Sequence, residues 1–256
     1  MNFSNVVDVA LSAGKAVLRI YEQSEGIVIE RKADNSPLTL ADRESHRVIV
    51  DGLTSLGLGL PILSEEGRDI PFATRREWKK YWLVDPLDGT KEFISRNGEF
   101  TINIALIDNG RPVAGVVYAP AMDLLYFTGN DGNAFKKTAN DPAVRMTVDA
   151  VAKDGLVAVQ SRSHPSQEEE SLLKARNIGK TIKIGSSLKF CLIAEGKAHL
   201  YPRFGPMMDW DMGAGHAVLE SAGGSVRTWK GNPIAYNMES LKQDQGVIAS
   251  SMTFAN

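Results

Sequence analysis

The hydrophobic pattern of the chain changes character twice along its length. Apolar residues recur every three or four positions at about 6–22 and 41–56, which predicts two amphipathic helices. Apolar residues then alternate with other residues around 100–106, and Asp108-Asn109-Gly110 predicts a hairpin turn, so strands of an antiparallel sheet follow. From about 156 to 250, strand-like and helix-like segments alternate. This order predicts a layered α/β fold.

A seam in the pattern falls near residues 140–155. There Asn140-Asp141-Pro142 and Lys153-Asp154-Gly155 interrupt the alternating segments with residues typical of turns. We therefore expect an N-terminal α+β half of residues 1–150, which carries most of the candidate acids, and a C-terminal α/β half of residues 151–256.

The central stretch, residues 81–93, joins an apolar run to two acids. Residues 81–84 have the length of a buried strand, and Pro86 lacks the N–H that a continuing strand needs, so we expect the strand to end at Asp85. Gly89 permits a tight turn, and Thr90 can begin a helix whose free N–H groups face back over Asp85 and Asp88. The same residues, taken alone, also fit an ordinary turn.

Two further acids stand at the ends of apolar segments. Glu65 follows the apolar residues 61–63, and Asp211 stands at the start of a predicted helix. Two carboxylates about 4 Å apart repel each other by roughly 4 kcal/mol at an effective dielectric of about 20. If these acids converge with Asp85 and Asp88, a cation must lie between them. Taken singly, Glu65 also fits a solvated strand end and Asp211 an N-terminal helix residue.

Composition narrows the class of partner. The chain has 43% hydrophobic residues and a net charge of −2, so it has a sizeable core and no basic field for nucleic acid. Its one cysteine, Cys191, excludes an internal disulfide, and no segment is typical of a signal peptide or a membrane span. We expect a cytoplasmic protein with a small-molecule partner. The sequence leaves open a monomer or homodimer and a peripheral association with the inner face of the inner membrane.

Three segments resemble the metal-site motifs of the inositol monophosphatase superfamily. They are Glu65-Glu66, Asp85-Pro86-Leu87-Asp88-Gly89-Thr90 and Trp210-Asp211-Met212-Gly213-Ala214-Gly215. The resemblance implies a five-layer αβαβα sandwich with the active site between its halves, and a Mg²⁺-dependent phosphatase that Li⁺ inhibits. Within the superfamily, Lys91-Glu92-Phe93 and Gly98-Glu99-Phe100-Thr101 resemble the CysQ-type 3'(2'),5'-bisphosphate nucleotidases.

The resemblance also implies the metal ligands. One Mg²⁺ takes Glu65, Asp85 and the carbonyl oxygen of Leu87, and a second takes Asp85, Asp88 and Asp211. All are hard oxygen ligands, as Mg²⁺ prefers, and the superfamily leaves two or three ions per active site open.

The remaining site residues divide between water activation and substrate binding. The resemblance implies that Thr90 hydrogen-bonds the attacking water. Residues 32–37 match a loop that, in bisphosphate nucleotidases, brings an acid beside that water, and in this sequence the acid is Asp34. The proton then passes to Asp34 or to Glu65. The expected substrate-binding residues are Asp88, Gly89, Thr90, Lys91 and Asp211, together with Ser186, Lys189 and Arg203, which the resemblance places at a 5'-phosphate or ribose-phosphate site.

The resemblance implies hydrolysis of the 3'-phosphate of adenosine 3',5'-bisphosphate to AMP, and of the same phosphate in its sulfated analogue, in sulfur assimilation. An inositol monophosphatase is an open alternative, which Lys91-Glu92-Phe93 disfavours because those enzymes typically have Thr-Asn-Phe there. A protein of another class, a non-catalytic nucleotide or metal sensor on the same fold, is the second alternative.

Overall fold

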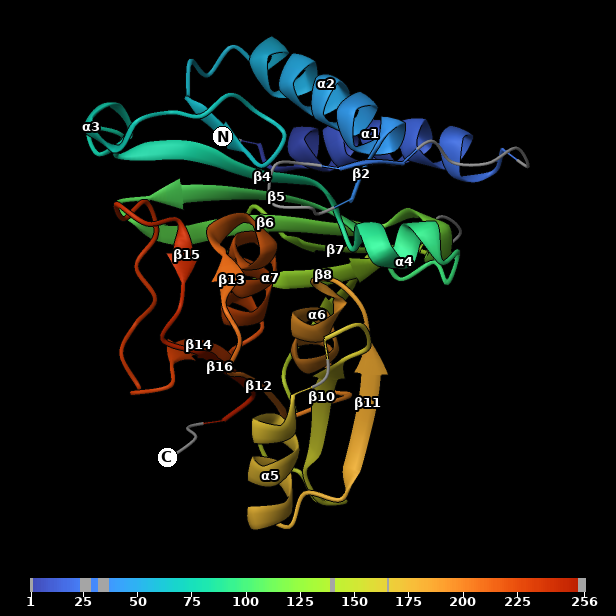
Figure 1. The fold of residues 1–256 in the computed structure, drawn as a ribbon, viewed down its shortest axis with the longest axis vertical. Coiled ribbons are helices and arrows are strands. Elements are labelled where there is room, and N and C mark those ends of the chain that lie inside the picture. Colours follow the sequence, from blue (N-terminus) through green and yellow to red (C-terminus); the bar gives the residue numbers. More distant parts are fainter. Residues whose placement is uncertain (1, 24–28, 32–36, 139–140, 165, 253–256) are drawn as a thin grey trace.

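The computed structural model describes residues 2–23, 29–31, 37–138, 141–164 and 166–252, and its elements stack in layers (Figure 1). Helices α1 (Ser4–Tyr21) and α2 (Leu40–Ser55) lie side by side on one face of the larger sheet. Their buried residues, among them Val6, Val17 and Ile49, pack on Trp82 and Ile104 of that sheet. The two helices predicted from the apolar spacing are therefore confirmed.

The larger sheet has seven strands within the described residues, in the spatial order β3-β4-β5-β6-β7-β8-β9. Strands β3 and β4 pair in parallel, and every later neighbour pairs antiparallel. The predicted hairpin is present, because Asn109 and Gly110 both have positive φ between β5 and β6. The strands are β3 (Ile62–Ser64), β4 (Lys80–Asp88), β5 (Thr101–Asp108), β6 (Arg111–Ala119), β7 (Leu124–Thr128), β8 (Ala134–Lys137) and β9 (Val144–Met146).

One prediction about β4 is wrong. The strand does not end at Asp85 but continues to Asp88, with a shift of register against β5 between the two acids. Proline does not stop the strand here because it falls inside this irregularity, where a ladder hydrogen bond is already missing.

The second sheet has the order β11-β10-β12-β16-β14 in the described chain. Helices α6 (Leu188–Ala194) and α7 (Asp209–Ser221) lie between the two sheets, and α5 (Gln167–Ala175) covers the outer face through Leu173. The helix-sheet-helix-sheet-helix order confirms the predicted five-layer sandwich. The strands are β10 (Val157–Ser161), β11 (Lys180–Ile184), β12 (Leu200–Arg203), β14 (Ser225–Thr228) and β16 (Val247–Ser250).

Shorter elements connect these layers. Strands β1 and β2 pair antiparallel just before α2, and β13, just before α7, pairs antiparallel with β15, which follows β14. They are β1 (Ile29–Arg31), β2 (Pro37–Thr39), α3 (Phe72–Arg75), α4 (Thr90–Ile94), the 3-10 helix η1 (Pro120–Met122), β13 (Met207–Met208) and β15 (Lys242–Gln243).

The two sheets share one apolar core. Leu83 of β4, Met212 of α7 and Val247 of β16 belong to the same buried cluster. The first sheet ends at Met146 and the second begins at Val157, but the packing is continuous across that gap. The division at residue 150 therefore stays a prediction. No helix in the described ranges is both long and apolar enough to cross a membrane.

Candidate active site

Two loops bring three of the predicted acids to adjoining strand ends. The amide of Glu65 donates to the carbonyl oxygen of Val84 at 3.1 Å, so the turn after β3 lies against β4. Asp85 is 1% exposed, and its Oδ1 accepts from the amide of Leu87 at 3.1 Å. The register shift then places Asp88 opposite Thr101 of β5.

The fourth acid comes from α7. This helix begins at Asp209, two residues before the predicted start, and Oδ2 of Asp211 accepts from the amide of Met208 at 2.9 Å. The carboxylate therefore caps its own helix, as its position suggested, and still faces the other acids. Burial raises the pKa of Asp211 well above its usual range, and the charges of Asp88 and Glu65 raise it further.

The same repulsion acts on the β4 acids. Burial raises the pKa of Asp85 most, followed by the charges of Glu65, Asp88 and Asp211 and a hydrogen bond with Glu65. Burial also raises the pKa of Asp88, although Lys189 and the hydroxyl of Ser187 oppose that shift. Carboxyl groups that share a hydrogen bond and repel one another need a proton or a cation between them.

These acids fit a divalent cation by their chemistry. The set consists of carboxylates and the nearby Leu87 backbone, which are the hard oxygen donors that Mg²⁺ prefers. Within the described part of the chain, no three His, Cys, Asp or Glu side chains already have the geometry of a metal cluster. The fit therefore rests on donor type, burial and mutual repulsion, and the ligand set stays a prediction.

Thr90 has a buried carboxylate partner that the sequence reading missed as a site residue. Gly89 has φ of 90°, which glycine favours, and Thr90 then begins α4 as predicted. The Thr90 Oγ1 donates to Oδ1 of Asp42 at 3.4 Å, and Asp42 is 2% exposed. Its Oδ2 accepts from the amide of Thr39 at 2.8 Å and from the Thr39 hydroxyl at 2.5 Å.

One oxygen of the Asp42 carboxylate belongs to the capping box of α2, and the other oxygen reaches Thr90. Asp34, which the resemblance suggested beside the attacking water, lies outside the described residues.

A short turn links the acids to the C-terminal half. The hydroxyl of Ser187 lies 3.0 Å from Oδ2 of Asp88 and 2.6 Å from the carbonyl oxygen of Asp211. The Nδ2 of Asn103 also donates to Ser187 at 2.9 Å. Ser186, just before it, has φ of 50°, and its buried hydroxyl has no hydrogen-bond partner among the described residues. A buried unpaired hydroxyl is a candidate ligand contact.

The two predicted cations lie at different depths. Lys189 is 7% exposed, and its Nζ donates to the carbonyl oxygen of Ser186. Burial lowers the pKa of Lys189, and the charges of Asp88 and Glu92 partly offset this. Arg203 is less buried, and its Nη1 donates to the carbonyl oxygen of His164 at 3.2 Å. Lys189 therefore adjoins the acids as well as Arg203.

Arg203 has a buried counter-ion that was also missed. Its Nη1 lies 3.6 Å from Oε1 of Glu169, whose side chain is fully buried on α5. Lys91, the remaining predicted residue, is exposed, and its Nζ lies 3.0 Å from Nε2 of His164. Neither contact had a local signal in the sequence, because the partners are far apart along the chain.

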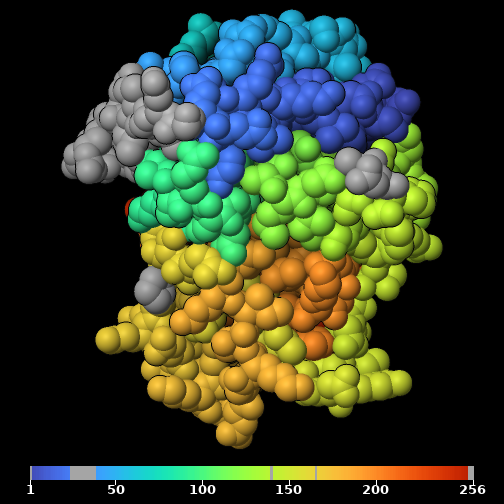
Figure 2. Space-filling view, turned by 90° about the vertical axis from the view of Figure 1, so that its right-hand side faces the viewer, coloured from blue at the N-terminus to red at the C-terminus, as the bar shows by residue number. Residues whose placement is uncertain are grey.

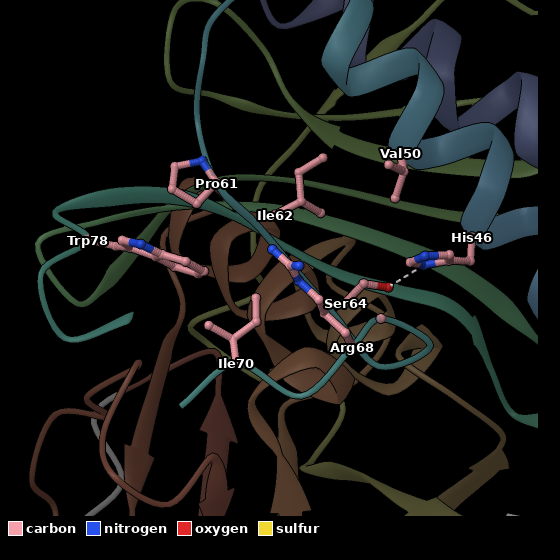
Figure 3. A pocket seen from close by; sticks show the side chains of 9 residues that line it. His46, Val50, Pro61, Ile62, Ser64, Arg68, Ile70 and Trp78 are labelled. Carbon is pink, nitrogen blue, oxygen red and sulfur yellow. Dashed lines mark hydrogen bonds between the residues drawn. The ribbon is translucent and has the colours of Figure 1, made fainter. Parts of the chain in front are cut away.

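A hollow lies between α2, β3 and the segment that follows β3 (Figure 3). It has a volume of about 280 Å³ and is mainly apolar, with Ile62, Ile70 and Trp78 among its walls. The Nδ1 of His46 on α2 lies 2.9 Å from the Ser64 hydroxyl, next to Glu65. This contact links β3 to α2.

Comparison with known proteins gives the class of this site. The sequence model of the inositol monophosphatase family matches residues 3–255. The chain belongs to the inositol monophosphatase family, and the resemblance drawn from its motifs is confirmed. That family is metal-dependent, generally on Mg²⁺.

Its relatives narrow the assignment further. The chain is 49% identical over 232 residues to the 3'(2'),5'-bisphosphate nucleotidase CysQ of Escherichia coli K12, covering 90% of this chain and 92% of that protein. It is equally identical, over the same shares, to the protein of that name from Shigella flexneri. The crystal structure of CysQ from Bacteroides thetaiotaomicron has a TM-score of 0.84 and 42% identity, covering 97% of this chain and 96% of that one.

Proposed function

We propose that this chain is a metal-dependent 3'(2'),5'-bisphosphate nucleotidase. It removes the 3'-phosphate of adenosine 3',5'-bisphosphate to give AMP, and the same phosphate of the sulfated analogue, in cytoplasmic sulfur assimilation. The observation that carries the proposal is a pair of adjoining sites: buried acids beside Thr90, and buried Lys189 with Arg203 beyond them. The similarity to bisphosphate nucleotidases supports the same substrate class.

The acids would hold two or three Mg²⁺ ions. The proposed ligands are Glu65, Asp85, the Leu87 carbonyl oxygen, Asp88 and Asp211. When bound, the ions offset the phosphate charge, stabilise the leaving oxygen and acidify a water molecule for in-line attack. Inhibition by Li⁺ is typical of the family.

The side chains of this protein orient that water. Because the Thr90 hydroxyl donates to Asp42, its lone pairs are free to accept a hydrogen bond from the water. The water oxygen then faces the phosphorus atom. As the water attacks, its proton passes to Thr90 Oγ1 while Thr90 passes its own proton to Asp42. Asp42 thus joins Asp34 and Glu65 as a proposed proton acceptor.

The second phosphate is held by the C-terminal half. The buried Ser186 hydroxyl can donate to a phosphate oxygen, and Lys189 and Arg203 supply charge-assisted contacts. An enzyme with only one phosphate to bind needs no such second set. This distinguishes the proposal from the inositol monophosphatase alternative.

The test is phosphate release with Mg²⁺ on adenosine 3',5'-bisphosphate, inositol 1-phosphate and fructose 1,6-bisphosphate side by side. We expect the highest kcat/KM on the nucleotide. A preference for inositol 1-phosphate would establish the alternative enzyme. Nucleotide binding without turnover of any of the three would instead support a sensor.

A further inference from the structure

We propose that Glu99 and Arg162 form a positioning clamp that fixes the spacing between the acid cluster and the second phosphate site. Glu99 lies in the loop between α4 and β5, and Arg162 follows β10. The Nε of Arg162 lies 2.6 Å from Oε2 of Glu99, and Nη2 lies 2.7 Å from Oε1. The inference rests on the proposed function, because it concerns selectivity between substrates with one and two phosphates.

The clamp holds more than two side chains. Oε2 of Glu99 also accepts from the amide of Gly185 at 2.8 Å, and Nη2 of Arg162 donates to the carbonyl oxygen of Lys183 at 2.8 Å. Glu99 therefore ties the loop before β5 to the ends of both β10 and β11. Figure 2 shows this junction, where the green segment around residues 90–100 meets the yellow segment of the C-terminal half.

These contacts differ from an ordinary surface ion pair. Exposed pairs contribute little to stability because water and salt screen them. The Arg162 side chain is 44% exposed, but that of Glu99 is 13% exposed, their pairing is bidentate, and one Glu99 oxygen also accepts a backbone hydrogen bond. A bidentate pair of this kind fixes the relative orientation of the two side chains as well as the distance between them.

A second glutamate packs into the same junction. Glu92 is 4% exposed, and its Oε1 accepts from the hydroxyl of Ser163, next to Arg162. A Cβ at Gly185 would lie 2.6 Å from Cγ of Glu92 and 2.9 Å from the Glu99 carbonyl oxygen. Glycine at position 185 thus lets the two segments approach closely. Both glutamates belong to the motifs that resemble the CysQ-type nucleotidases, and neither is among the proposed metal ligands.

Both clamped segments lead directly to substrate-binding groups. Gly185 precedes Ser186 and Ser187, and the Ser187 hydroxyl lies 3.0 Å from Oδ2 of Asp88. Arg162 precedes His164, whose carbonyl oxygen accepts from Arg203. Loosening the clamp would move Ser186 and Arg203 relative to Asp88 while leaving the acids in place. The expected result is poorer recognition of the uncleaved phosphate.

The experiment compares adenosine 3',5'-bisphosphate with adenosine 3'-monophosphate, which lacks the second phosphate. We expect Glu99→Gln and Arg162→Gln each to lower kcat/KM for the bisphosphate by about tenfold, mainly through KM, because a charge-assisted contact contributes that much. The monophosphate should change by less than about twofold, within the effect of ordinary surface changes. Arg162→Lys keeps the charge but loses the bidentate pairing, so its loss of kcat/KM for the bisphosphate should lie between those of the unmodified protein and Arg162→Gln.

Three further variants separate positioning from a general loss of structure. The double variant Glu99→Gln/Arg162→Gln should lose no more selectivity than either single variant, because both remove the same pairing. Gly185→Ala should reproduce the selectivity loss without altering any charge. Arg76→Gln, which removes an exposed ion pair with Glu77 at 3.1 Å, should leave kcat/KM unchanged for both substrates.

Two outcomes would overturn the clamp. Equal losses on both substrates, accompanied by a lower melting temperature, would show that the pair is merely structural. Unchanged selectivity in Glu99→Gln would show that the spacing is fixed elsewhere. Failure of the proposed function looks different, since the unmodified protein would then fail to prefer the bisphosphate at all.

Discussion

Lys189 and Arg203 should differ in what their removal does, although both are expected at the same phosphate. Lys189 is buried beside the acids, where its charge lowers the pKa of Asp88, whereas Arg203 pairs with Glu169. Lys189→Met keeps the buried apolar stem that places Nζ 5.5 Å from the centre of the Tyr201 ring. Arg203→Met alone would leave the fully buried Glu169 without its cation, so the matched variant is Arg203→Met/Glu169→Gln.

The size of the effect follows from the contact each cation makes. A charge-assisted hydrogen bond to phosphate contributes about 1.5–3 kcal/mol, equivalent to about ten- to a hundredfold in kcat/KM. Both variants should lower kcat/KM for adenosine 3',5'-bisphosphate by that factor. Only Lys189→Met should also shift the Mg²⁺ requirement, because it removes a positive charge next to Asp88. Without the positive charge of Lys189, which would repel a bound cation, half-maximal activity should need less Mg²⁺.

The assay is phosphate release from the bisphosphate and from adenosine 3'-monophosphate, each across a Mg²⁺ titration. Identical Mg²⁺ dependence in all three proteins would refute the placement of Lys189 beside the metal ligands. Equal losses on both substrates in the Arg203 variant would show that Arg203 does not contact the second phosphate. Circular dichroism and melting temperature serve as controls for folding.

Four other substitutions test three separate parts of the structure. Asp211→Asn should abolish phosphate release, yet in EDTA its melting temperature should equal or exceed that of the unmodified protein, because one repelling charge is gone; a clear loss of stability in EDTA would contradict this. Thr90→Ala and Asp42→Asn should lower kcat far more than they raise KM in steady-state kinetics, and a change in KM alone would make Thr90 a binding residue. Arg75 is 3% exposed and donates to Asn237 Oδ1 and to the carbonyl oxygens of Met238 and Glu239. Arg75→Ala should therefore lower the unfolding free energy in urea by about 3–5 kcal/mol with kcat retained, and a loss of kcat in folded protein would argue against a purely structural role.

Regular elements could be predicted because their signals are local. The apolar stripe of α1 and the Asn109-Gly110 turn each depend on a few neighbouring residues, and both are present. The end of β4 could not be predicted, since Pro86 forbids one ladder hydrogen bond but says nothing of pairing that resumes at Asp88. That resumption depends on β5, which lies later in the chain.

The partners of the site residues were hidden for a similar reason. Asp42 satisfies a local rule completely as the third residue of a capped helix, so nothing in its neighbourhood points to Thr90, 48 positions away. Lys189 resembles a surface cation at a helix start, and only the packing of α6 against α7 buries it beside Asp88. The motifs indicated the acids and Thr90, whereas Asp42 as the partner of Thr90 and Glu169 as the partner of Arg203 became apparent only in the fold.

The position of Asp211 relative to the β4 acids follows from a close backbone approach. A Cβ on Gly115 of β6 would overlap the carbonyl oxygen of Ala214, and a Cβ on Gly213 would lie 2.8 Å from Cδ2 of Leu83. Helix α7 therefore packs onto the sheet at a distance that side chains at these two positions would not allow. Leu83 stands two residues before Asp85, and Gly213 two residues after Asp211, so the close approach of α7 lies next to both predicted metal-binding segments. The approach of Gly115 to Ala214 is between two backbones, which cannot relax as a side chain can, so we expect it to hold the acids at a fixed separation before any cation binds.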